Sequence, residues 1–354
     1  MNRIEKVREK FSPNEIDGFV SFKRENIRYL TGFSGSTAAV FLTRDRAFFL
    51  TDFRYKTQAE NEVKGNFDIR ECKKIIESLS ELIRSLGLRK IGFESNLSYS
   101  IYLELQDKLN PARLVSTKNL IEDIRIVKYP EEVDCIRKAI GIAGRAFKGI
   151  RGIIRQGCKE RDIAIEMEHR LRKEGTETIP FDIIVASGDR GAMPHGIAGD
   201  KIIKDGELVI VDFGSRYKGY HSDCTRTLAM GGFNTRQREI YDIVLSAQRN
   251  AIKAIKPGEK ASEVDSKARE HIKNAGFGDN FGHGTGHGVG LEVHESPRIA
   301  EGQDDIIKEG MVFTVEPGIY IPGWGGIRIE DMALVTKDGC EVLTSSIEKE
   351  MEEF

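Results

Sequence analysis

The chain has 354 residues, more than a single hydrophobic core usually supports, so its length predicts two domains. Its 54 Lys and Arg residues nearly balance 56 Asp and Glu residues, which excludes a general electrostatic attraction to nucleic acid or to an anionic membrane. No apolar run reaches the roughly 20 residues of a membrane-spanning helix. Five scattered cysteines without a Cys-x-x-Cys pair favour reduced thiols, and we expect a cytoplasmic protein.

Short β-rich runs alternate with helical patterns in the first third of the chain, which predicts an α/β domain with a sheet covered by helices. The expected strands are Gly18–Phe22, Thr37–Thr43, Ala47–Thr51, Phe67–Ile69 and Lys90–Phe93, and the expected helices are Ile76–Leu86 and Tyr99–Leu109. The pattern changes within Ser116–Val127, where we place a domain boundary. Residues 1–120 then form the first domain and residues 121–354 the second.

The second domain begins with helices and then becomes rich in strands. Helical periodicity predicts helices over Glu131–Ile154, Glu160–Glu174, Arg236–Lys256 and Ala261–Ala275. Alternating or β-branched runs predict strands over Val209–Phe213, Gly219–Leu228, Val289–His294, Met311–Tyr320 and Gly326–Thr336. This order predicts an α+β domain with antiparallel hairpins. Lys–Glu pairs in Lys159–Lys173 and Arg236–Lys256 are interpreted as solvated helix faces.

Two aspartates, Asp212 and Asp223, lie inside neighbouring apolar runs that a polar, glycine-containing turn joins. A buried carboxylate is unfavourable unless a cation or hydrogen-bond donors compensate its charge, so the pair indicates a metal site. Satisfaction of both carboxylates by turn amides is the alternative. The Asp-Phe-Gly triplet at Asp212 does not indicate a kinase, because the kinase catalytic loop and Gly-rich phosphate loop are missing from the sequence.

Six of the seven histidines lie between His195 and His294, which places the expected chemistry in the second domain. His283, His287 and His294 fall within twelve residues that also hold glycines at alternate positions. Glycine lets the backbone approach a ligand closely, and imidazole binds transition metals or transfers protons. The glycines do not have the spacing of a dinucleotide-binding fingerprint.

Two glutamates complete a third cluster, Glu316 before Pro317 and Glu330 two residues after Arg328. Facing glutamates could bridge a pair of cations, and an Arg–Glu ladder across a hairpin is the alternative. Together the clusters supply four carboxylates and one imidazole. Such oxygen-rich ligation suits Mn²⁺, Co²⁺ or Zn²⁺ better than a structural zinc site.

These motifs occur in a characteristic order. They are Val211-Asp-Phe-Gly, Ser222-Asp-Cys-Thr-Arg-Thr, His283-Gly-Thr-Gly-His-Gly-Val-Gly, Val293-His-Glu, Glu316-Pro-Gly and Arg328-Ile-Glu-Asp. The set resembles the creatinase, aminopeptidase P and prolidase family, whose catalytic domain has the pita-bread fold. In the first domain, Ile27-Arg-Tyr-Leu-Thr-Gly-Phe-Ser-Gly-Ser and Leu50-Thr-Asp-Phe-Arg-Tyr are similar to the creatinase-type N-terminal domain. The resemblance thus covers nearly the whole chain and implies an Xaa-Pro peptidase.

The resemblance also implies a ligand set for two divalent cations, Mn²⁺ or Co²⁺ first and Zn²⁺ second. Asp212 would chelate one ion, Asp223 would bridge both, His287 would bind the second, and Glu316 and Glu330 would complete the shells, with Glu330 bridging. Every ligand position is filled, unlike in creatinase or in non-catalytic relatives.

The mechanism implied by two such cations is attack of a metal-bridging hydroxide on the bond before proline, with Glu316 as general base. His294 would hydrogen-bond the scissile carbonyl or the proline nitrogen. Arg328 would orient Glu330 or relay a proton. The remaining expected site residues line the proline pocket: His195, from Ala186-Ser-Gly-Asp-Arg-Gly-Ala-Met-Pro-His-Gly, together with His283, Phe181 and Tyr320.

The expected substrates are proline-containing peptides, and the resemblance implies a homodimer. Aminopeptidase P and prolidase activities both remain open at this point. Two other classes are retained as alternatives, a non-catalytic peptide-binding module on the same fold and a metal-free creatinase-type amidinohydrolase. The complete ligand set argues against both.

Overall fold

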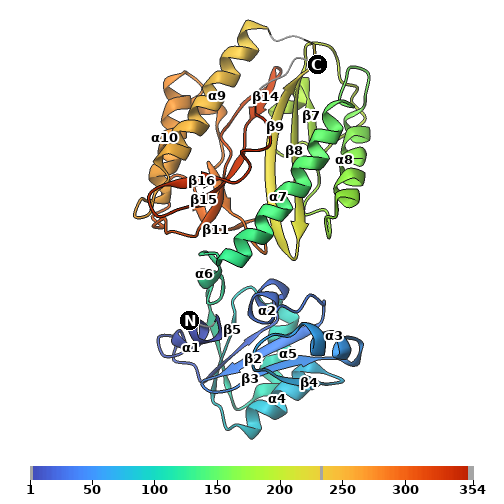
Figure 1. The fold of residues 1–354 in the computed structure, drawn as a ribbon. Helices are drawn as coiled ribbons and strands as arrows, with labels where there is room; N and C mark the ends of the chain where they lie inside the picture. Colours follow the sequence, from blue (N-terminus) through green and yellow to red (C-terminus); the bar gives the residue numbers. More distant parts are fainter. Residues whose placement is uncertain (1–2, 232–233, 350–354) are drawn as a thin grey trace. The chain divides into compact units, whose positions relative to one another are not determined.

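The computed structural model describes residues 3–231 and 234–349, and the chain divides into two compact units, Met1–Arg125 and Ile126–Phe354 (Figure 1). The first unit holds a six-stranded sheet in the order β4-β3-β2-β1-β5-β6. Its strands are β1 (Gly18–Ser21), β2 (Ala38–Thr43), β3 (Ala47–Thr51), β4 (Asp68–Glu71), β5 (Lys90–Glu94) and β6 (Arg113–Thr117). Strands β1 to β3 are buried along their whole lengths, as expected where both faces of a sheet are covered.

The helices of the first unit are α1 (Arg3–Glu9), α2 (Arg24–Thr31), α3 (Lys56–Glu62), α4 (Ile75–Ser85), α5 (Tyr99–Leu109) and α6 (Glu122–Arg125). Helix α4 shows why these segments are helical, because Ile76, Leu79, Leu82 and Ile83 recur at helical spacing and are buried. The predicted α/β class is confirmed. Helices α1 to α3 and strand β6 were not predicted, because elements this short carry little periodicity.

In the second unit (Figure 1), the described residues form two helix pairs and three sheets. Its helices are α7 (Pro130–Arg151), α8 (Glu160–Glu174), α9 (Thr235–Ala254) and α10 (Ala261–Asn274). Helix α7 packs on strands β8 (Leu208–Tyr217) and β9 (Tyr220–Ala229), and the Phe147 ring stacks on Phe213 with centroids 4.7 Å apart. Helices α9 and α10 pack on each other and on strands that follow them in the chain. The predicted α+β class is confirmed.

The strands of the second unit fall into a three-stranded sheet (β7-β8-β9), a five-stranded sheet (β11-β10-β12-β15-β16) and a two-stranded sheet (β13-β14). Their bounds are β7 (Ile184–Ser187), β8 (Leu208–Tyr217), β9 (Tyr220–Ala229), β10 (Gly286–Gly288), β11 (Glu295–Ile299), β12 (Val312–Val315), β13 (Gly318–Ile321), β14 (Gly325–Arg328), β15 (Asp331–Val335) and β16 (Cys340–Val342). Across the described residues, none of the helices is long and apolar enough to cross a bilayer.

Three strand predictions in this unit were wrong in their extent. The expected strand Val289–His294 is a bend between β10 and β11, where the Gly290 amide donates to the Glu292 carbonyl. The expected strand Met311–Tyr320 divides into β12 and β13 at Pro317, which has no amide hydrogen for a central ladder. The expected strand Gly326–Thr336 likewise divides into β14 and β15, which lie in different sheets.

Candidate metal centre

The β8–β9 hairpin places Asp212 and Asp223 on one face. Its register pairs Asp212 with Thr225 and Gly214 with Asp223. Opposite residues and residues two apart share a face, so Asp212, Asp223 and Thr225 point to the same side. A two-residue turn sets this register, since Lys218 (φ 47°) and Gly219 (φ 85°) both adopt the positive φ of a type I′ turn.

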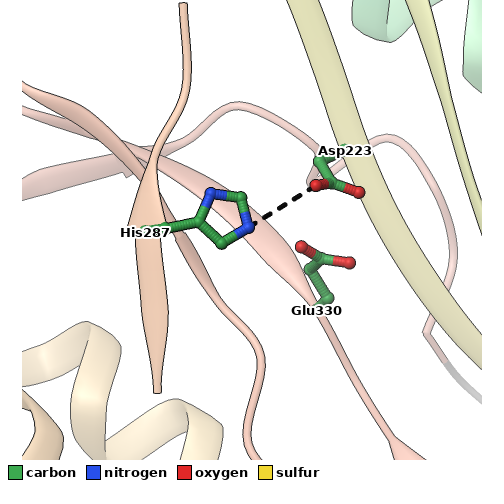
Figure 2. Close-up of side chains that lie close together, drawn as sticks. All are labelled: Asp223, His287 and Glu330. Carbon is green, nitrogen blue, oxygen red and sulfur yellow. Dashed lines mark ion pairs between the residues drawn. The ribbon is translucent and has the colours of Figure 1, made fainter. Parts of the chain in front are cut away.

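Asp223 converges with two residues from other segments, His287 of β10 and Glu330 from the link between β14 and β15 (Figure 2). One ligand atom of each lies within 4.8 Å of the others. His287 Nε2 is 3.7 Å from Asp223 Oδ2. His287 Nδ1 lies 3.1 Å from the Gly288 carbonyl, and protonation at Nδ1 leaves the Nε2 lone pair facing the carboxylates.

Glu316 joins the group through His287, because its Oε1 is 3.3 Å from His287 Nε2. Thr314 forms a hydrogen bond with each residue of this pair. Its hydroxyl donates to Glu316 Oε1 at 3.0 Å and accepts from the His287 amide at 3.1 Å. The break at Pro317 frees Glu316 from β12, and its amide donates to the Thr285 carbonyl at 2.7 Å.

Asp212 is held by the buried Arg328. Asp212 Oδ2 accepts from Arg328 Nη2 at 2.7 Å, whereas its Oδ1 is buried without a hydrogen-bond partner among the described residues. Arg328 Nε donates at 3.1 Å to Thr225 Oγ1, which itself donates to Glu330 Oε2 at 2.7 Å. Arg328 therefore pairs directly with Asp212 and reaches Glu330 through Thr225.

The concentration of buried negative charge in this group favours the binding of cations. Burial first, and then the charges of Asp212 and Glu316, raise the pKa of Asp223 well above its usual range. Burial and the charge of Asp223 do the same to the pKa of Glu330, and burial raises the pKa of Glu316. One arginine faces four carboxylates, and Asp212 Oδ1 still has no partner. An oxygen-rich set with one imidazole fits divalent cations.

Metal binding is therefore expected to compete with protons. The pKa values of Asp223, Glu316 and Glu330 are raised in the folded, metal-free protein. These carboxyl groups therefore keep their protons at pH values above about 4, where the same groups in the unfolded chain have already lost them. The free energy of unfolding of chelator-treated protein should then fall as the pH rises above about 4 and up through the raised pKa values.

Bound cations displace these protons, so the rise in Tm caused by Mn²⁺ should be larger at pH 8 than at pH 5.5. Scanning calorimetry of chelated and Mn²⁺-loaded protein at both pH values tests this. An equal Mn²⁺-induced shift at the two pH values would contradict it.

The other expected site residues surround this group. His283 Nε2 is 2.9 Å from the Tyr320 hydroxyl, which accepts from Arg328 Nη1 at 3.0 Å. The His294 ring centroid lies 4.1 Å from that of His287, and partial burial followed by the charge of His287 lowers the His294 pKa to about 4. Burial also lowers the pKa of His283.

His195 and Phe181 lie at the edges of the site. His195 is exposed, and the preceding residue, Pro194, brings its segment to the site because its carbonyl accepts from Arg328 Nη1 at 3.1 Å. Phe181 is half-buried beside the hairpin, where a Cβ at Gly214 would come within 2.8 Å of its ring.

Supporting residues on the helices were missed by the sequence interpretation. Asp265 on α10 accepts from the Thr285 amide and hydroxyl at 3.0 and 2.7 Å and forms a two-point ion pair with Arg269. Arg269 also donates to the His283 carbonyl at 2.7 Å. The pair thus fixes the glycine-rich segment that leads to His287. An i,i+4 Asp–Arg pair in sequence looks like a surface pair, so only the burial of Asp265 reveals its role.

The interpretation of Lys159–Lys173 as a solvated face was wrong for Glu160, which is fully buried. Its carboxylate accepts from the Ser187 amide and hydroxyl at 2.7 and 2.8 Å and from Arg190 Nε at 2.9 Å. Glu160 thereby anchors the start of the segment that carries His195. Gln248 on α9 is also fully buried and donates to the carbonyls of Val315 and Ile329.

Comparisons with known proteins agree with this geometry. Residues 134–337 match Metallopeptidase family M24, and residues 3–127 match the Creatinase/Prolidase N-terminal domain. A protein of Pyrococcus horikoshii named Xaa-Pro dipeptidase is 40% identical over 346 residues, which cover 97% of each chain.

Solved structures extend the likeness to the fold. The Xaa-Pro dipeptidase from Bacillus anthracis has a TM-score of 0.96 at 42% identity over 99% of both chains. The X-Pro aminopeptidase from Thermotoga maritima has a TM-score of 0.90 at 37% identity, over 96% of this chain and 98% of that one. The resemblance that the motifs indicated is confirmed. The protein belongs to metallopeptidase family M24 and carries the creatinase/prolidase N-terminal domain.

Proposed function

We propose that the protein hydrolyses the peptide bond before proline, acting as an Xaa-Pro dipeptidase with two divalent cations, Mn²⁺ or Co²⁺ before Zn²⁺. The observation that carries the proposal is the convergence of Asp223, His287 and Glu330, with Glu316 and Asp212 beside them. The relatives named Xaa-Pro dipeptidase, at 40% and 42% identity over nearly the whole chain, support the substrate class.

The five proposed ligands differ in their expected roles. The family resemblance implies that Asp223 and Glu330 would contact both cations, that Asp212 would hold one, and that His287 would hold the other, with Nε2 as the nitrogen that faces the carboxylates. Glu316 completes the set. When bound, such cations act as Lewis acids that polarise the scissile carbonyl and lower the pKa of an attacking water.

The residues of the chain supply the proton transfer and the orientation. Glu316 is the proposed general base, because its carboxylate lies among the proposed ligands, 3.3 Å from His287 Nε2. His294, with its pKa lowered to about 4, is neutral at pH 7 and can donate a hydrogen bond to the scissile carbonyl or the proline nitrogen. Arg328 holds Asp212 in place and keeps the Tyr320 hydroxyl directed at His283.

The proline ring is proposed to lie among His195, His283, Phe181 and Tyr320. Tyr320 and His283 are fixed to each other, so they form a rigid wall. A longer peptide would extend beyond the proline. Release of the first residue from such peptides, the aminopeptidase P activity, is the second candidate, because one similar structure is named X-Pro aminopeptidase from Thermotoga maritima.

Hydrolysis of Ala-Pro and of Ala-Pro-Gly by chelator-treated protein, with and without added Mn²⁺ or Co²⁺, tests the proposal. We expect metal-dependent turnover with Ala-Pro preferred, and a kcat about 10²- to 10⁴-fold lower for Glu316→Gln. Preference for Ala-Pro-Gly would instead indicate an aminopeptidase P. Bound metal without cleavage of either peptide would indicate a binding module, and metal-independent hydrolysis of creatine an amidinohydrolase.

We also propose that the protein works in the cytoplasm as a homodimer. All five cysteines are free thiols, which suits a reducing compartment. The dimer follows from the family resemblance, and sedimentation equilibrium would test it, because a monomer at micromolar concentration would contradict it.

A further inference from the structure

A buried ionic cluster lies behind the β8–β9 hairpin, on the side away from the proposed ligands. Arg226 follows Thr225 in β9, and strand alternation turns its side chain to the opposite face. Its Nη2 pairs at 2.9 Å with Asp331 Oδ1, the fully buried carboxylate directly after Glu330. Arg226 Nη1 also donates to the Glu330 carbonyl. The cluster therefore holds the backbone of a proposed ligand from behind.

A distant segment, Thr344–Lys349, completes this cluster, and we call it the clasp. The Thr344 hydroxyl donates to Asp331 Oδ1 at 2.7 Å. Arg226 donates to the clasp carbonyls of Ile347 at 2.7 Å and Glu348 at 3.1 Å. The clasp is thus attached both to Asp331 and to its partner Arg226.

Among the described residues of the clasp, Lys349 is the one whose positively charged side chain contacts Asp331. Its ammonium group pairs with Asp331 Oδ2 and donates to Gln248 Oε1 at 3.0 Å. Gln248 Nε2 in turn donates to Asp331 Oδ2 at 3.1 Å and to the Ile329 carbonyl at 3.2 Å. Asp331, which follows Glu330, therefore contacts Lys349 directly, and Ile329, which precedes it, contacts Gln248, the hydrogen-bond partner of Lys349.

This arrangement bears on metal binding because Glu330 lies in a link between two sheets rather than within a strand. Within this link the Glu330 amide donates to the Thr225 carbonyl of β9 at 3.2 Å, and its carboxylate accepts from the Thr225 hydroxyl. Its position therefore depends on these two contacts and on the groups that hold its neighbours Ile329 and Asp331. A ligand displaced by a fraction of an ångström loses affinity for the cation, and partners behind the ligands typically contribute 10- to 100-fold.

We propose that Lys349 is a positioning residue for the metal centre, which holds Asp331 and Gln248 and thereby fixes the Glu330 carboxylate in its place as a ligand. The inference rests on the proposed function, because it takes Glu330 as a ligand. It assigns a role in the centre to a residue that contacts none of the proposed ligands.

Calorimetric titration of chelator-treated protein with Mn²⁺ tests this, using Lys349→Met, Lys349→Arg and Glu348→Gln beside the wild type. Lys349→Met keeps the length of the side chain and should raise the Mn²⁺ Kd about tenfold. Lys349→Arg keeps the charge and should restore most of the affinity. Glu348→Gln is the matched control, because its side chain is 64% exposed, pairs with Arg151 and should leave the Kd unchanged.

The titrations should be made well below the Tm of each variant, with the Tm of metal-free protein measured separately. A Lys349→Met variant that lowers the Tm but binds Mn²⁺ with the wild-type Kd would show a purely structural role and overturn the inference alone. Failure of the wild type to bind Mn²⁺ or to cleave Ala-Pro would overturn the proposed function, and this inference with it.

Discussion

Replacing Asp223 with asparagine is expected to lower kcat/KM for Ala-Pro by roughly 10³-fold or more and to prevent binding of two Mn²⁺ ions. The substitution conserves shape but removes the charge at the centre of the ligand group, where His287 and Glu330 approach Asp223. Titration calorimetry gives the stoichiometry, and peptide hydrolysis gives the rate.

The same substitution should raise the Tm of the metal-free protein. Burial and the neighbouring carboxylates oppose ionisation of Asp223, so a neutral side chain relieves an unfavourable interaction once cations are removed. Asp242→Asn, at an exposed position on α9, is the control and should change neither property. An Asp223→Asn enzyme that binds two Mn²⁺ ions and cleaves Ala-Pro normally would contradict the assignment.

Replacing Arg328 with methionine is expected to destabilise the metal-free protein by about 3–5 kcal/mol at pH 8, measured by urea denaturation. The side chain is 4% exposed, and its loss leaves Asp212 without its buried counter-charge. The hydroxyls of Thr225 and Tyr320 lose a donor as well.

Arg328→Lys provides the comparison, because lysine keeps the charge but cannot make the fork of contacts to Asp212, Thr225 and Tyr320. It should recover only part of the lost free energy of unfolding. A change below about 1 kcal/mol for Arg328→Met would show that Asp212 is compensated by other means.

Sequence patterns indicated the candidate ligands because each lies in an unusual local context. Asp212 and Asp223 interrupt apolar runs, and His287 lies among alternating glycines. Long elements were also found, since the helices α7 to α10 and the hairpin β8–β9 each span enough residues for a clear period. The class of both domains followed from the order of these elements.

The supporting contacts could not be predicted, because they join residues far apart in sequence whose types are common on surfaces. Glu160, Asp265 and Gln248 lie on charged helices, and only tertiary packing shows that they are buried. The strand breaks beside Glu316 and Glu330 were missed for a related reason. β-Branched residues continue on both sides of each break, so periodicity alone sees one strand where the chain changes sheets.

The tight turn at Lys218 and Gly219 restricts which insertions and deletions the β8–β9 hairpin can accept. Asp212 and Asp223 share a face because their register is counted from that turn. A single-residue insertion or deletion in β8 between Asp212 and the turn would move Asp212 to the opposite face and leave Asp223 in place. In the course of evolution the stretch between Asp212 and Asp223 can therefore hardly change its length.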